Sequence, residues 1–188
     1  MSTSVQQQTQ DCKLHVTATQ VSPSLLRIHY QVTNQTAQPL YLFNRLDKPG
    51  GKSVFDTSPD AVDIALTNGR VTVSKTIPFV PDDREVEARY TPCMSRVEPR
   101  GTYDETLELS LPLVPLTHYN GRPQTKKPLL RPLYFELGYL VATPQFETRV
   151  RRVETSQGLA YYLSLAPERQ TVLAAGPLLS EVSVFSER

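Results

Sequence analysis

Residues 14–32 read LHVTATQVSPSLLRIHYQV, and they alternate in polarity on both sides of the dipeptide Ser22-Pro23. Before the dipeptide, apolar side chains stand at the even positions from Leu14 to Ala18. After it, they stand at the even positions from Leu26 to Val32. A period of two is typical of strands with one buried and one exposed face. The stretch therefore predicts two antiparallel strands joined by a turn.

Short strands of this kind recur along the chain, about ten in all, and turn residues separate them. Asn68-Gly69 predicts a tight hairpin because both residues accept a positive φ. Ser156-Gln157-Gly158 predicts a second hairpin, and residues 166–175 form the one stretch that predicts a short helix, with Pro167 in its first turn. The further predicted strands are residues 40–46, 61–66, 71–77, 85–90, 102–111, 133–141, 145–153, 159–165 and 178–185.

The fold class predicted from this pattern is all-β, an antiparallel immunoglobulin-like β-sandwich, with a jelly roll as the alternative. The 16 prolines agree with it, because proline is excluded from helix interiors and central strands. We expect residues 1–12 to be a flexible tail and residues 13–188 to be one sandwich domain with a proline-rich insertion at 112–132. The residues expected in the core are Leu26, Ile28, Tyr30, Val32, Leu107 and Leu109.

The charge is nearly balanced, with 20 Lys and Arg against 19 Asp and Glu. A nucleic-acid partner is not expected, because such proteins carry a marked positive charge. A membrane partner is not expected either, because no apolar stretch is long enough to span a bilayer. The polar N-terminus does not resemble a signal peptide, so a cytoplasmic location is predicted, or a secreted one if a signal peptide has been removed.

Cys12 and Cys93 are predicted to be reduced, buried thiols, although the sequence leaves open whether they pair. A three-residue loop after the first strand would set His15 opposite His29. Two imidazoles alone are a poor metal site, so we expect both to face solvent and leave metal binding as the alternative. His118 is expected to be a loop contact beside Tyr119 rather than a catalytic base.

No sequence signature of catalysis is present. The chain lacks a G-x-S-x-G elbow, a P-loop and a G-x-G-x-x-G loop. The acidic run at 82–87 lacks the glycine that calcium loops use, and we expect it to be a solvated edge. The protein is therefore expected to be no enzyme and to use no cofactor and no metal.

Two short motifs carry a family resemblance. Residues 30–36 (YQVTNQT), followed by Pro39-Leu40-Tyr41-Leu42, resemble a hairpin of immunoglobulin-like intracellular domains. Residues 97–103 (VEPRGTY) are similar to the proline–glycine entry of a late strand in the same folds. Both features resemble the bacterial intracellular proteinase-inhibitor (BsuPI-like) family, over residues 25–111. The resemblance implies an immunoglobulin-like sandwich and an inhibitor-like role.

The predicted function is a non-enzymatic protein-binding module, with a protease-inhibitor-like domain as one form, acting through loops or an edge strand. Within the insertion, Tyr119, Lys126 and Lys127 are the predicted partner contacts, on a loop expected to be exposed, irregular and mobile. An equal alternative is that this loop only bridges the two sheets or packs down over a sheet edge. The alternative function is a self-assembling structural subunit, such as a capsid or sheath protein, in which the partner is a second copy of the chain.

Overall fold

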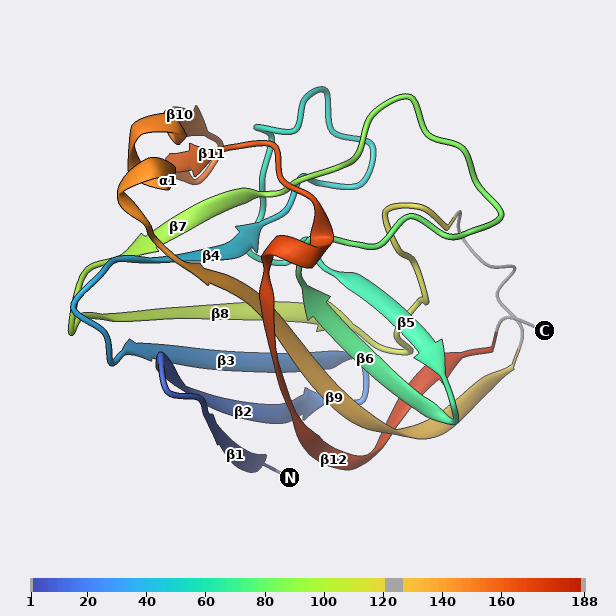
Figure 1. Ribbon diagram of the computed structural model, residues 1–188. Helices are drawn as coiled ribbons and strands as arrows, with labels where there is room; N and C mark the ends of the chain where they lie inside the picture. Colours follow the sequence, from blue (N-terminus) through green and yellow to red (C-terminus); the bar gives the residue numbers. More distant parts are fainter. Residues whose placement is uncertain (1, 121–126, 187–188) are drawn as a thin grey trace.

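A computed structural model describes residues 2–120 and 127–186, which form two packed sheets with little helix (Figure 1). The predicted all-β sandwich is therefore confirmed. The smaller sheet is antiparallel throughout, and it brings every predicted core residue to its buried face. Its strands, in spatial order, are β1 (Ser2–Gln8), β2 (Cys12–Ser22), β3 (Leu25–Asn34) and β8 (Thr102–Ser110).

The larger sheet is mixed rather than purely antiparallel. Its strands, in spatial order, are β10 (Arg151–Thr155), β11 (Gly158–Tyr162), β7 (Cys93–Val97), β4 (Leu40–Arg45), β9 (Pro128–Val141), β6 (Arg70–Lys75) and β5 (Asp63–Thr67), and β12 (Thr171–Phe185) also pairs with β9. The pair β6–β9 is parallel, so the prediction of antiparallel sheets is wrong there. Between these two strands the chain crosses to the smaller sheet and back, and such a crossover is what parallel neighbours require.

The larger sheet is covered on both faces. Leu40 and Leu42 of β4 join the main core between the sheets, whereas Tyr41 and Phe43 join a second cluster on the outer face. The rings of Phe146 and Tyr161 cover that second cluster, and both contact the Tyr41 ring. This two-sided burial explains why the sequence of β4 is a continuous run of large apolar residues rather than an alternation.

A buried ion pair lies between the two sheets. The ammonium of Lys75 on β6 is 3.0 Å from the carboxylate of Glu105 on β8, and the lysine side chain is fully buried. The Lys75 ammonium also donates to the carbonyls of Asn44 (3.0 Å) and Pro59 (2.8 Å). Tyr30 donates to Glu105 (2.7 Å) and accepts from the Asn44 side chain (2.9 Å). Each charge thus has the partners that burial demands.

The predicted flexible tail at residues 1–12 is wrong for most of its length. Residues Ser2–Gln8 form β1, which pairs with Lys13–Thr19 of β2, and Val5 packs against the core. β1 also lies beside β12. Backbone hydrogen bonds along the edge of β2 hold this glutamine-rich segment, and such bonds do not need an apolar pattern in the side chains.

The predicted facing of His15 and His29 is also wrong. His15 lies opposite Gln31, and His29 lies opposite Thr17. The turn is tighter than expected, because Ser22 pairs with Leu25, and the register shifts between Gln20 and Ser22. The observed register differs from the expected one by two residues, and because the side-chain period is two, every side chain stays on its expected face.

Three later predictions need correction. Residues 85–90 form no strand, and residues 145–153 begin with a helix, α1 (Pro144–Arg149), before β10. Thr143 caps α1 by accepting from the Phe146 amide, and Pro144 opens its first turn, so the start signals were present. The helix predicted at 166–175 is only a 3-10 turn, η1 (Pro167–Arg169). In the described part of the chain, no helix could span a bilayer.

The assignment of the buried and exposed faces of β3 can be tested by measuring the stability of two variants. Ile28→Ala should lower the free energy of unfolding by about 2–5 kcal/mol, because it removes buried contacts and leaves a cavity. The neighbouring change His29→Ala, on the exposed face, should cost less than about 0.5 kcal/mol. Urea unfolding of both variants checks the assignment of the faces, and equal losses would contradict it.

The buried ion pair provides a second test. Lys75→Met should destabilise the protein by about 3–5 kcal/mol, because Glu105 is left buried without its counter-charge. Adding Glu105→Gln to this variant should recover part of the loss. The measurement is a double-mutant cycle from urea unfolding. Additive losses would show that the two charges do not stabilise each other.

Candidate functional site

A pocket of about 420 Å³ lies where β4 ends and β5 begins. Figure 1 shows the course of the loops that join these strands to their neighbours. Four separate segments converge at the pocket, and loops held by a rigid sheet are a common place for binding sites. The lining residues are Leu46, Asp47, Pro49 and Gly50 after β4, Val62 and Asp63 at the start of β5, Arg84 and Tyr90 before β7, and residues 116–120 after β8.

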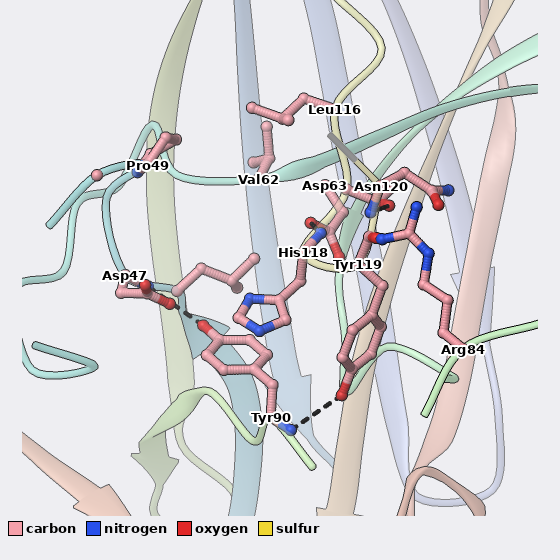
Figure 2. A pocket seen from close by; sticks show the side chains of 13 residues that line it. Asp47, Pro49, Val62, Asp63, Arg84, Tyr90, Leu116, His118, Tyr119 and Asn120 are labelled. Carbon is pink, nitrogen blue, oxygen red and sulfur yellow. Dashed lines mark hydrogen bonds between the residues drawn. The ribbon is translucent and has the colours of Figure 1, made fainter. Parts of the chain in front are cut away.

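Stacked rings form one wall of the pocket. The imidazole of His118 lies over the ring of Tyr90, with centroids 3.8 Å apart and planes 11° apart (Figure 2). Tyr119 meets His118 edge-on, and its hydroxyl accepts a hydrogen bond of 3.0 Å from the Tyr90 amide. The Tyr90 hydroxyl in turn accepts from the amide of Asp47 at 3.3 Å. These contacts fix the rings relative to the loop that carries Asp47.

The segment that carries His118 is held against β5. Ile64 and Leu116 exchange two backbone hydrogen bonds, of 2.7 and 2.9 Å. Two residues farther on, the amide of His118 donates to the carboxylate of Asp63 at 2.8 Å. This isolated bridge adds a short antiparallel pairing along the edge of β5 and places Asp63 beside the stacked rings. The site is therefore built on the sheet rather than on free loops.

Burial perturbs the ionisable groups of the pocket. It raises the pKa of Asp63 from 3.8 to about 6, although the His118 amide opposes the shift, and the neighbouring carboxylate of Asp47 raises it further. Burial also lowers the pKa of His118, with Asp47 acting in the opposite direction. Burial therefore disfavours the charged forms of both Asp63 and His118. Perturbed groups of this kind gather at functional sites.

The cations near the pocket form their hydrogen bonds and ion pairs with groups other than Asp47 and Asp63. In Figure 2, Asp47 lies to the left of the stacked rings and Arg84 to the right, where its guanidinium donates to the carbonyl of Tyr119. Lys48, next to Asp47 in sequence, forms an ion pair of 2.9 Å with Asp56 instead. Within the described residues, neither Asp47 nor Asp63 has an ion-pair partner. The pocket thus suits a ligand that brings hydrogen-bond donors or positive charge.

The predicted insertion at 112–132 is neither wholly exposed nor wholly irregular. Leu113 and Tyr119 are buried, and residues 128–132 belong to β9. Tyr119 is 9% exposed and braces Tyr90, so it does not project from the loop, and its role as a partner contact stays a prediction. The prolines of this segment suggest an exposed loop, but proline is also compatible with the first residue of a strand, as at Pro128.

The two lysines predicted to contact a partner differ in whether the structure describes them. Lys127 is exposed just before β9, and Lys126 lies outside the described residues. His118 is a loop contact beside Tyr119, as expected, but it also lines the pocket.

The cysteine and metal predictions can be compared with the described residues. Cys12 and Cys93 are both buried free thiols on different sheets. His15 contacts Ser4, and His29 lies 3.8 Å from the carboxylate of Asp104. Across residues 2–120 and 127–186, no group of three or more His, Cys, Asp or Glu side chains is placed to hold a metal ion.

Asp47, Asp63 and Tyr90 were not singled out by the sequence. Asp47 stands at the start of a predicted loop, and Tyr90 ends a predicted strand that does not form. A chemical signal existed only in the pair His118-Tyr119, because adjacent aromatic side chains in a proline-rich loop suggest an ordered contact. Their convergence with Asp47 and Asp63 depends on strand order, which the sequence does not state.

Comparison with protein-family models, curated proteins and solved structures finds no match for this chain. The resemblance to the BsuPI-like family therefore stays a prediction. The geometry of the pocket is the main guide to the function of this protein.

The raised pKa of Asp63 has a measurable consequence for stability. An acid whose pKa is higher in the folded state than in the unfolded state destabilises the fold as the pH rises from about 4 to about 6, and the penalty persists above that range. Asp63→Asn keeps the acceptor for the His118 amide and removes the charge. Because the half-buried carboxyl is partly screened by solvent, the variant should be more stable by about 1–2 kcal/mol near pH 7.

Urea unfolding as a function of pH checks this expectation. The stability gain of Asp63→Asn should nearly vanish at about pH 4, where the folded wild-type protein already carries a protonated Asp63. Asp104→Asn, which changes an exposed carboxylate on the smaller sheet, is the matched control and should show no such pH dependence. A gain that is the same at both pH values would mean that the carboxylate of Asp63 is not destabilised by the pocket.

Proposed function

We propose that the chain is a non-enzymatic protein-binding module of the immunoglobulin-like type, and that its partner docks at the pocket end of the sandwich. The observation that carries the proposal is the pocket itself, with its fixed aromatic wall and two carboxylates that have no ion-pair partner among the described residues. A partner segment lying across the loops would insert one side chain into it. Binding through a pre-formed pocket limits the entropy lost on association.

The surroundings of the pocket favour a protein partner over a small molecule. The loop that supplies Arg84 and Tyr90 also carries Phe79 and Val86, which are 64% and 37% exposed. Exposed apolar side chains beside a polar pocket are typical of protein contact surfaces. A protease-inhibitor-like role is one form of this function, and its support is the family resemblance of residues 25–111.

Catalysis has less support from the same residues. Among the described residues, no hydroxyl or thiol is hydrogen-bonded to the His118 imidazole, so a nucleophile–base pair of the usual kind is not formed. Self-assembly through the edge of β8 also has less support. Asp104 and Glu108 lie along that edge, and Asp60 covers it by accepting from the Glu108 amide at 2.7 Å. Charges on an edge strand oppose pairing with another strand.

Selection of displayed peptides tests the proposed function. A library of random linear peptides displayed on phage should yield peptides that bind the wild-type protein. Asn120→Trp fills the rim of the pocket at an exposed position and should weaken their binding by about tenfold or more. The matched control Gln31→Trp places the same bulk on the exposed face of β3 and should leave binding within about twofold.

Fluorescence anisotropy with synthetic versions of the selected peptides gives the affinities. Melting curves should first show that both tryptophan variants are folded. A selection that yields no peptides, or peptides that bind Asn120→Trp as well as they bind the wild type, would overturn the proposal that the pocket is the docking site.

A further inference from the structure

We propose that the partner side chain that enters the pocket is cationic, the guanidinium of an arginine or the ammonium of a lysine. This inference rests on the proposed function and names the chemistry of its anchor residue. It is drawn from the charges that line the pocket, the aromatic wall beside them, and the absence of a counter-ion for those charges among the described residues.

The first argument is the uncompensated negative charge. Asp47 and Asp63 line the same pocket and lie close enough for Asp47 to raise the pKa of Asp63. Burying two carboxylates together is costly unless a cation or several donors accompany them. Elsewhere the chain meets this requirement, as it does for Lys75 and Glu105. From the described residues, only the amide of His118 donates to the Asp63 carboxylate.

The second argument is that, among the described residues, the nearby cations form no ion pair with Asp47 or Asp63. Lys48 could reach toward Asp47 from the next position in the chain, but it pairs with Asp56. Arg45 donates to Ser95 at 2.9 Å, and Arg84, which itself lines the pocket, donates to the Tyr119 carbonyl. Because none of these neighbouring cations forms an ion pair with either carboxylate in the described part of the chain, both carboxylates stay open to direct contact with a cationic ligand.

The third argument is the aromatic wall. A cation over the face of an aromatic ring gains an attraction beyond ordinary contact, and guanidinium groups also stack on such rings. The stacked pair Tyr90–His118 lines the pocket together with the two carboxylates. A carboxylate or phosphate ligand is disfavoured, because Asp47 and Asp63 would repel it.

The charges of the pocket also determine how binding should depend on pH. The groups that face Asp63 are Asp47 from the loop after β4, His118 from the segment paired with β5, and Arg84 and Tyr90 from the loop before β7. As the pH rises through about 6, Asp63 ionises, while burial lowers the pKa of His118 and so disfavours the imidazolium that would offset this charge. The pocket becomes more negative, so affinity for a cation should increase over this range.

The test uses small probes with the full-length protein. N-acetyl-arginine methylamide is titrated into ¹⁵N-labelled protein and compared with the citrulline analogue, which has nearly the same shape and no charge. The arginine probe should shift the amide signals of Asp47, Asp63 and His118, with a dissociation constant of about 1 mM, and the citrulline probe should bind about tenfold more weakly. A glutamate analogue should not bind in the pocket.

Variants then assign the effect to the carboxylates. Asp63→Asn and Asp47→Asn should each weaken binding of the arginine probe by about fivefold to tenfold, while the control Asp104→Asn leaves it unchanged. Asp63→Asn should also remove most of the rise in affinity between about pH 5 and about pH 7. Equal binding of arginine and citrulline, or no shift at the pocket amides with either probe, would overturn the inference.

These outcomes separate the inference from the proposed function. If the displayed peptides depend on the pocket but bind equally well after their arginine and lysine residues are replaced by citrulline and norleucine, the inference fails and the proposed function stands. If the arginine probe binds as expected but no displayed peptide depends on the pocket, the cationic preference of the pocket stands and the proposed function fails.

Discussion

The ion pair between Lys75 and Glu105 joins the two sheets, and the same lysine anchors the segment that leads to the pocket. The Lys75 ammonium donates to the carbonyl of Asn44, near the end of β4, and to that of Pro59, in the loop that leads to β5. That segment carries Asp47 to the pocket and returns at Asp63. A lysine at a core position therefore constrains both the packing of the sandwich and the loop that forms one wall of the pocket.

The ionisable groups of the pocket differ from those of the core in how well they are paired. Between the sheets, Lys75 and Glu105 have each other and further hydrogen-bond partners. At the pocket, Asp63 retains a carboxyl that is costly to ionise, and burial lowers the pKa of His118, which is stacked on Tyr90. Functional sites often carry groups that lower stability, and the proposed role of the pocket in recognition would account for this one.

The sequence predicts the sandwich well because its signal is local. The alternation in β2 and β3 identifies the buried faces, and Asn68-Gly69 identifies a hairpin whose two residues do adopt positive φ. Prediction fails where backbone pairing or distant contacts decide the structure. Gln6 and its neighbours form β1 without an apolar pattern, and Lys75 interrupts a core face because its partner lies on another sheet. The pocket joins four distant segments, so Tyr119, expected to project from an exposed loop, instead supports the wall of the site.

The burial of β4 on both faces has a consequence for the expected dynamics of the pocket. β4 lies between β7 and β9, its Leu40 and Leu42 face the main core, and its Tyr41 and Phe43 lie beneath α1 and β11. Backbone amides in such a strand exchange with deuterium only when the whole domain opens. Asp47 follows two residues after β4 ends, so one wall of the pocket is continuous with a strand whose amides we expect to exchange slowly. We expect motion of the pocket to be greater on its opposite side, in the exposed chain around Arg84.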